Sequence, residues 1–196
     1  MKRVILASNS PRRIEILNTF NIKFDVIPSE YNEKMLNFLS PYELVCELSE
    51  RKASNVAQKV GEDCIIIGAD TVVYKDGDIL GKPSDEKDAF NMLSKLSGDC
   101  HKVITGICII DKKEKNIYKS YEETLVYFKN LTENEIMDYI KTKEPFDKAG
   151  AYGIQGFGGL FVEKIEGCYF NVVGFPVNKL YTALGNMGVN LLTGEI

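Results

Sequence analysis

Short β-rich runs alternate with helical segments along this sequence, and that order predicts a mixed α/β protein. The apolar runs at 65–67 and 107–110 have the length of strands, whereas other stretches repeat apolar residues at helical spacing. No Pro-, Gly- or Ser-rich linker divides the 196 residues. Since a domain usually holds about 100–200 residues, we expect a single domain over residues 1–196.

The N-terminal region begins with an apolar run at 4–7, which predicts a strand. Ser10 and Pro11 follow as the N-cap and the first-turn proline of a helix. Ser40 and Glu43 then have the spacing of a capping box, which predicts a second helix.

The middle of the chain contains a further apolar run at 64–68, typical of a fully buried strand. Asp76-Gly77 is a hairpin-turn sequence and predicts that strands over 71–74 and 78–80 pair with each other. Similar patterns continue along the rest of the chain. The elements expected there are a helix over 85–96, strands over 102–110 and 117–128, a helix from 132 to about 142, a strand over 160–165 and a helix over 176–187.

The composition disfavours several classes of protein. Lys plus Arg total 24 and Asp plus Glu total 28, and the net charge of −4 argues against a nucleic-acid partner. Five cysteines without a C-x-x-C pair disfavour a disulfide scaffold or a zinc ribbon, and the single histidine excludes a site that needs two imidazoles. No apolar run approaches the ~20 residues of a membrane span, and the N-terminus lacks a signal-peptide core. We therefore expect a cytoplasmic protein that binds neither nucleic acid nor membrane.

The segment 8–13, Ser-Asn-Ser-Pro-Arg-Arg, places two arginines in the first turn of a predicted helix. A helix start carries unpaired N–H groups and a partial positive charge, which favour phosphate. Arg12 and Arg13 would add bidentate contacts to phosphate oxygens. The hydroxyls of Ser8 and Ser10 would add further donors. The alternative is an ordinary capped helix with two solvated arginines.

Asp70 lies in the sequence Gly-Ala-Asp-Thr at 68–71, at the expected mouth of the buried strand. Open α/β sheets bind their ligands at such strand ends. A carboxylate there can ligate Mg²⁺ or act as a general base on water. The alternative is an aspartate that hydrogen-bonds the backbone of its own turn. Glu33 is a candidate to share a metal with Asp70, and the alternative is a solvated loop glutamate.

Two further segments are candidates for binding phosphate or a base. The Gly-Lys-Pro sequence at 81–83 fails the spacing of a P-loop, so Lys82 is either a phosphate-pairing charge or a solvated loop lysine. Glycines in the stretch 147–159 allow the backbone to approach a ligand closely. Gln155 in this stretch offers a donor and an acceptor that suit the edge of a base. The alternative is a flexible loop.

Three remaining features carry weaker signals. Lys52 lies on the helix that Ser40 caps, where a surface lysine is the default interpretation. His101 has no catalytic partner nearby in the sequence and is expected to be structural. Residues 171–176 predict a strand end followed by a helix start, which either closes the site or caps the last helix.

Taken together, these segments closely resemble one family, the Maf proteins, which are nucleoside triphosphate pyrophosphatases first named for septum formation. The matching pieces are, in chain order, SNSPRR at 8–13, Glu33, RKA at 51–53, GADT at 68–71, GKP at 81–83, DKAGAYGIQG at 147–156 and NVVGFP at 171–176. They span nearly the whole chain. Phe175 departs from the leucine that the family more often has there.

The resemblance implies a fold similar to that of inosine triphosphatase, with an elongated, twisted mixed sheet flanked by helices and a cleft between two lobes. It implies hydrolysis of a nucleoside triphosphate to the monophosphate and pyrophosphate, with a divalent cation. From the chemistry of the residues, Asp70 with Glu33 is the candidate pair that would hold this cation as Mg²⁺ or Mn²⁺. The family assigns the role of proton acceptor to the residue that matches Asp70. It assigns substrate selection to those that match Arg12, Thr71 and Gln155. Thr71 and Gln155 also resemble the branch that prefers dTTP and UTP.

The chemistry of the residues agrees with this resemblance. A triphosphate carries about four negative charges, so its site needs clustered cations and a metal. Four cationic side chains are available if they converge: Arg12, Arg13, Lys52 and Lys82. General base and metal ligand are competing roles for Asp70.

Several alternatives stay open at this point. The same pocket would serve a non-catalytic nucleotide-binding regulator of cell division. An RNA-binding protein is disfavoured by the acidic balance. A third alternative is hydrolysis of another triphosphate, such as a modified pyrimidine nucleotide. The fold is also compatible with a homodimer.

Overall fold

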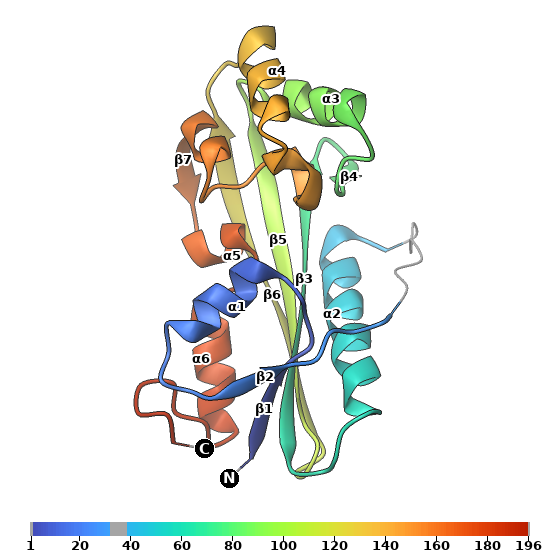
Figure 1. Cartoon of the computed structure of the whole chain (residues 1–196), viewed down its shortest axis with the longest axis vertical. Helices are drawn as coiled ribbons and strands as arrows, with labels where there is room; N and C mark the ends of the chain where they lie inside the picture. Colours follow the sequence, from blue (N-terminus) through green and yellow to red (C-terminus); the bar gives the residue numbers. More distant parts are fainter. Residues whose placement is uncertain (1, 32–38, 196) are drawn as a thin grey trace. The chain divides into compact units, whose positions relative to one another are not determined.

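The computed structural model describes residues 2–31 and 39–195, and within them the chain is a mixed α/β protein (Figure 1). Its strands are β1 (Arg3–Leu6), β2 (Phe24–Val26), β3 (Cys64–Lys75), β4 (Asp78–Leu80), β5 (Cys100–Asp111), β6 (Asn116–Phe128) and β7 (Val162–Glu166). Its α-helices are α1 (Pro11–Asn18), α2 (Pro41–Ala57), α3 (Glu86–Leu96), α4 (Glu133–Lys141), α5 (Tyr169–Val173) and α6 (Val177–Asn186). Shorter 3₁₀ helices are η1 (Glu144–Asp147), η2 (Ala149–Ala151) and η3 (Phe157–Phe161).

Within the described residues the strands form a seven-stranded sheet in the order β2-β1-β3-β5-β6-β7, with β4 paired to β3. Strand β1 runs parallel to β2 and β3, whereas β3 with β4 and β6 with β7 are antiparallel. The sheet is therefore mixed, as predicted. The pairing of β1 with β3 ends where Leu6 lies opposite Ile67, and the Ala7 N–H donates to the Ile67 carbonyl at 2.8 Å.

The chain divides into two compact units. Unit 1 contains Met1–Asp70, Thr105–Glu122 and Gly174–Ile196, and unit 2 contains Thr71–Ile104 and Glu123–Val173. Strands β3, β5 and β6 each contribute residues to both units. The expectation of a single domain over residues 1–196 stays a prediction.

Unit 1 has a core between its strands and the helix α2. Ile5 of β1 and Ile66 of β3 are fully buried and belong to one apolar cluster with Ala53 and Val56 of α2. Figure 1 shows α2 on one side of the unit 1 strands and α6 on the other. On the α6 side, Lys179 Nζ lies 3.4 Å from a carboxylate oxygen of Glu122 on β6. The sheet is therefore flanked by helices, as the sequence predicted.

Unit 2 has its own apolar core, built from α3, α4 and the adjoining strands. Leu93 of α3 and Ile140 of α4 are buried in the same cluster as Val103, Val126 and Phe128 of the strands. The aromatic ring of Phe128 makes edge contacts with neighbouring rings in this cluster. Each unit therefore has an apolar core of its own beside the strand segments that carry its polar residues.

Local sequence signals predicted the helix starts and the hairpin well. Ser40 with Glu43 forms the predicted capping box of α2, and Thr132 with Glu135 forms that of α4. The Asp76-Gly77 turn joins β3 and β4 as an antiparallel hairpin, as expected. Among the described residues, no helix is long and apolar enough to cross a membrane.

Three expectations for the chain path were wrong. Residues 64–68 and 71–74 are not separate strands, because β3 runs without a break from Cys64 to Lys75. Residues 171–173 lie in the short helix α5 and not at a strand end. The strand expected from residue 160 begins at Val162, because the glycine-containing segment before it folds as η3.

Candidate functional site

Two glycines allow α2 to lie directly against the sheet in unit 1. A Cβ atom on Gly68 of β3 would lie 2.3 Å from the Ser49 carbonyl oxygen, and one on Gly106 of β5 would lie 2.3 Å from the Val45 carbonyl oxygen. Real Cβ atoms do not approach backbone oxygens that closely. The missing side chains therefore set the depth at which α2 packs on β3 and β5.

This packing brings Lys52 of α2 to Asp70 of β3. Asp70 is two residues after Gly68, so its side chain points to the same face of the strand, toward α2. Lys52 Nζ donates to Asp70 Oδ1 at 2.5 Å. The two side chains are only 15% and 11% exposed, so their charges are weakly screened by solvent.

The position of Asp70 corrects two interpretations of the sequence. Asp70 is not a turn residue that bonds its own backbone, because it lies within the unbroken strand β3. It also does not stand at the end of its own strand. It lies three residues beyond Ile67, the last residue of β3 that pairs with β1, and so at the carboxyl end of β1. Lys52 is likewise not the surface lysine of the default interpretation.

At the start of α1, the side chain of Ser8 accepts hydrogen bonds in place of the side-chain capping expected of the N-cap residue Ser10. Ser10 makes no side-chain capping bond. Instead Ser8 Oγ accepts from the Ser10 N–H at 3.2 Å and from Arg13 Nη1 at 3.3 Å. Arg13 Nε also donates to the Gly174 carbonyl at 2.9 Å, so this half-buried guanidinium is held by two hydrogen bonds to the protein. Arg12 is half-buried beside it in the first turn of α1.

The segment after α5 therefore contributes to the α1 region through Gly174. Gly174 has a φ of +109°, which a residue with a side chain rarely adopts. Its carbonyl fixes Arg13, and Phe175 and Pro176 behind it are buried. Residues 171–176 thus contact Arg13 through Gly174 and also lead into α6, whose N-cap residue is Pro176.

Unit 2 contains Thr71, Lys82 and Gln155. Thr71 is half-buried and directly follows Asp70 in β3, whereas Lys82 and Gln155 are exposed. The Gly150 N–H donates to the Gly81 carbonyl at 3.0 Å, which joins the Gly-Lys-Pro segment to the glycine-rich stretch. Unit 2 thus links the two segments that carry Lys82 and Gln155.

The structure brings predicted site residues into contact within unit 1, whereas in unit 2 it joins the segments that carry Lys82 and Gln155. Unit 1 brings Lys52 to Asp70 and Ser8 to Arg13. Glu33 lies outside the described residues.

His101 occupies the core of unit 2. It is buried, its Nε2 lies 2.8 Å from the Tyr152 hydroxyl oxygen, and its ring makes an edge contact with Phe128. Burial lowers the pKa of His101 to about 3, so the ring is neutral near pH 7. These contacts agree with the structural role expected of this residue.

The donor set around Asp70 has a limited capacity for a metal ion. Among residues 2–31 and 39–195 no group of three or more His, Cys, Asp or Glu side chains could hold one. Mg²⁺ commonly binds through one or two carboxylates, with phosphate oxygens and water as its other ligands. The Asp70 carboxylate therefore fits a cation that arrives with a phosphate chain, not one enclosed by protein ligands.

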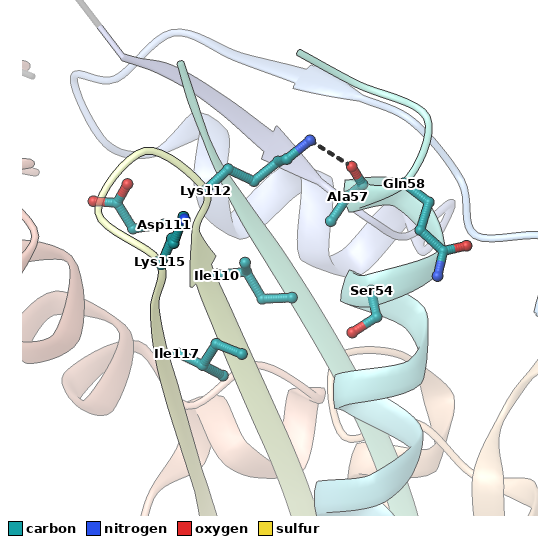
Figure 2. Close-up of a pocket in the computed structure, with 8 residues that line it drawn as sticks. All are labelled: Ser54, Ala57, Gln58, Ile110, Asp111, Lys112, Lys115 and Ile117. Carbon is teal, nitrogen blue, oxygen red and sulfur yellow. Dashed lines mark hydrogen bonds between the residues drawn. The ribbon is translucent and has the colours of Figure 1, made fainter. Parts of the chain in front are cut away.

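A shallow hollow elsewhere in unit 1 contains none of the predicted site residues (Figure 2). Its volume is about 460 Å³. It is lined by Ser54, Ala57, Gln58, Ile110, Asp111, Lys112, Lys115 and Ile117. Lys112 Nζ donates to the Ala57 carbonyl at 2.8 Å and so satisfies the end of α2. The residues that line this hollow are thus separate from the Lys52–Asp70 pair.

Comparisons with known proteins identify the family. A family model described as Maf-like protein matches residues 3–187, and this chain belongs to that family. A "dTTP/UTP pyrophosphatase" of Caldicellulosiruptor saccharolyticus is 52% identical over 199 residues, which cover 100% of both chains. A protein of the same name from Clostridium tetani is 54% identical over 189 residues, 95% of this chain and 98% of that one. The predicted membership of the Maf family is confirmed.

A solved structure supports the fold. The Ham1 protein of Staphylococcus aureus matches with a TM-score of 0.52 at 14% sequence identity, over 95% of this chain and 100% of that chain. At this identity the likeness concerns the fold alone. It agrees with the mixed α/β architecture described above.

Proposed function

We propose that this chain hydrolyses dTTP and UTP to the nucleoside monophosphate and pyrophosphate with a divalent cation. The observation that carries the proposal is the Lys52–Asp70 pair, a buried carboxylate held at 2.5 Å by an ammonium group. The names of the relatives, dTTP/UTP pyrophosphatases about as long as this chain, support the substrate class.

Asp70 is the catalytic residue in this proposal. Water attacks the α-phosphorus, the bond from that phosphorus to the bridging oxygen breaks, and pyrophosphate leaves. The Asp70 carboxylate accepts the proton that the water loses. Lys52 fixes one oxygen of the carboxylate and so orients the base, and the strand β3 and helix α2 hold both groups on regular secondary structure.

The α1 start binds part of the phosphate chain in this proposal. Backbone N–H groups of a helix start and the positive end of its dipole favour a negatively charged group. Arg13 is pre-oriented by Ser8 and by the Gly174 carbonyl, which lowers the entropy lost on binding. Arg12 and Lys82 add positive charge toward the triphosphate.

A divalent cation, Mg²⁺ or Mn²⁺, is bound by Asp70 together with Glu33 in this proposal. When bound, such a cation neutralises and polarises the phosphate chain. Because Asp70 cannot serve fully as ligand and base at once, its two proposed roles compete. Selection among bases is assigned to Thr71, Gln155 and Arg12.

The proposal extends to the domain organisation, the partners and the location of the protein. Residues 1–196 act as one Maf-like domain whose partner is the nucleoside triphosphate, and not nucleic acid or membrane. We place the protein in the cytoplasm, and a homodimer is compatible with this assignment.

Pyrophosphate release tests the proposal directly. Wild type is assayed with dTTP, UTP, CTP, GTP and ATP in Mg²⁺ and in Mn²⁺, beside Asp70→Asn. We expect release from dTTP and UTP, reduced at least about a hundredfold in Asp70→Asn because the base is lost.

Asp111→Asn is the matched control, because Asp111 accepts from Lys2 Nζ at 2.6 Å in a similarly buried pair of the same unit. This control is expected to lose stability and keep turnover. Equal loss of turnover in both variants would overturn the role of Asp70. Nucleotide binding by the wild type without pyrophosphate release would favour the non-catalytic regulator instead.

A further inference from the structure

The segment that carries Gln155 is bent around the side chain of Glu144. The Phe157 N–H donates to Glu144 Oε2 at 2.9 Å, and the Gly158 N–H donates to Glu144 Oε1 at 3.2 Å. Two backbone donors just after Gln155 are thus satisfied by one carboxylate. Hydrogen bonds to an ionised acceptor are about twice as strong as neutral ones, so this contact restrains the chain.

Tyr139 holds the same segment on the other side of Gln155. Its hydroxyl accepts from the Gly153 N–H at 3.3 Å and donates to Glu144 Oε1 at 2.9 Å. Tyr139 is 4% exposed, and its ring makes an edge contact with Phe161 at 5.0 Å between centroids. Burial, with the Glu144 hydrogen bond, raises the pKa of Tyr139, so its hydroxyl stays protonated and keeps donating.

The glycines of this segment fit closely around these two side chains. A Cβ atom on Gly156 would lie 2.3 Å from Glu144 Oε2, and one on Gly158 would lie 2.7 Å from the Tyr139 hydroxyl oxygen. The sequence suggested that these glycines admit a ligand. The structure shows that what approaches them here is the protein itself.

The two restraining residues lie on helical elements. Tyr139 lies in the last turn of α4, and Glu144 begins η1 three residues after that helix. Lys148 Nζ donates to the Glu144 carbonyl at 2.7 Å and ties the far side of η1 back to the same residue. The backbone on both sides of the exposed Gln155 is therefore anchored to α4 and η1.

We propose that Tyr139 and Glu144 are positioning residues that set the base preference of the enzyme by fixing the backbone on either side of Gln155. This inference rests on the proposed function and on the assignment of Gln155 to base selection. UTP presents a carbonyl acceptor at the ring position where CTP presents an amine donor. An amide distinguishes the two only when its own orientation is fixed, since it carries both a donor and an acceptor.

The test compares Tyr139→Phe with Tyr127→Phe. The Tyr127 hydroxyl donates to Glu166 Oε2 at 3.1 Å in the same unit, so each variant loses one tyrosine–glutamate hydrogen bond. Only Tyr139 also contacts the Gln155 segment. We measure kcat and KM for UTP and CTP and the thermal midpoint of each variant. The ratio of kcat/KM for UTP over that for CTP should fall about tenfold in Tyr139→Phe and stay unchanged in Tyr127→Phe.

A double-mutant cycle with Gln155→Ala separates positioning from general damage. In the Gln155→Ala background, Tyr139→Phe should leave the UTP-over-CTP ratio unchanged, because the group that it positions is gone. Glu144→Gln is the second variant, and it should lower the ratio in the same direction because an amide cannot accept with both terminal atoms.

The outcomes distinguish the positioning role of Tyr139 and Glu144 from the proposed function itself. An unchanged ratio in folded Tyr139→Phe and Glu144→Gln overturns the inference while the proposed function stands. An equal fall of the ratio in Tyr127→Phe also overturns it, because the effect then follows general stability. A wild type that releases no pyrophosphate from UTP overturns the proposed function itself.

Discussion

The surroundings of Asp70 in unit 1 and of Gln155 in unit 2 hold their polar groups by different means. Asp70 lies on a strand and is fixed by an ion pair from a packed helix, with no loop involved. Gln155 lies in a glycine-rich loop. Backbone N–H groups of this loop donate to the Glu144 carboxylate and to the Tyr139 hydroxyl. The first arrangement depends on helix packing and an ion pair, and the second depends on hydrogen bonds to the backbone. We therefore expect changes around Asp70 to alter turnover and changes around Gln155 to alter base preference.

The largest effect is expected where packing fixes the geometry. In Gly68→Ala the new methyl group meets the Ser49 carbonyl oxygen at 2.3 Å, and neither backbone can move without shifting α2 from β3. We expect a loss of about 3 kcal/mol in the free energy of unfolding, measured by urea titration. Turnover should fall with it, because α2 carries Lys52, whereas the UTP-over-CTP ratio should not change.

Gly61→Ala is the matched control for that variant. No atom lies within 4 Å of a Cβ built on Gly61, in the same unit just after α2. Its free energy of unfolding should stay within about 0.5 kcal/mol of wild type. A Gly68→Ala protein as stable as Gly61→Ala would show that α2 is not held by this close contact.

The sequence predicted features that depend on neighbouring residues and missed features that depend on distant ones. The caps at Ser40 and Thr132 and the Asp76-Gly77 turn are local signals, and each is complete within a few residues. The role of Gly68 is different, since it depends on a helix that lies elsewhere in the sequence. From the sequence, Asp70 is compatible with a turn residue, and strands over 64–68 and 71–74 are expected on either side of it, where the structure has the single strand β3.

The Tyr139–Glu144 contact was not predicted for a similar reason. From the sequence, the glycines of the stretch 147–159 predict a backbone that a ligand can approach closely. A signal was available, because every buried backbone N–H needs an acceptor and glycine supplies none from a side chain. Counting those donors points to an acidic residue nearby, and Glu144 is the acceptor that the structure provides. Pairing it with Tyr139 still requires the tertiary fold.

A smaller effect, confined to unit 2, is expected from pH. Burial in the core holds the pKa of His101 at about 3, against 6.5 for an unperturbed histidine. Between these values the unfolded chain binds a proton that the folded chain does not, so stability falls as the pH drops below 6.5 and is unaffected above it. At pH 5 this one group should cost about 2 kcal/mol.

Urea titrations of wild type and His101→Gln at pH 7 and pH 5 measure this contribution. The variant should be less stable than wild type at pH 7, because the bond with Tyr152 is altered. It should then lose about 2 kcal/mol less than wild type between the two pH values. Since the sequence contains a single histidine, no second imidazole obscures the difference. Equal losses in both proteins would contradict the neutral, buried state of His101.

The smallest effect on stability is expected when the N-cap hydroxyl of one helix is removed in each unit. Ser40 Oγ accepts from the Glu43 N–H at 3.3 Å at the start of α2, and Thr132 Oγ1 accepts from the Glu135 N–H at 3.2 Å at the start of α4. Ser40→Ala and Thr132→Ala should each cost about 1 kcal/mol in the free energy of unfolding. Neither cap touches Lys52, Tyr139 or the residues that they hold, so turnover and the UTP-over-CTP ratio should both stay at wild-type values. If Thr132→Ala lowered the ratio as far as Tyr139→Phe does, base preference would follow the stability of α4 and not the tyrosine hydroxyl. If only Tyr139→Phe lowers it, the preference depends on that hydroxyl, and the two units differ in function as they differ in construction.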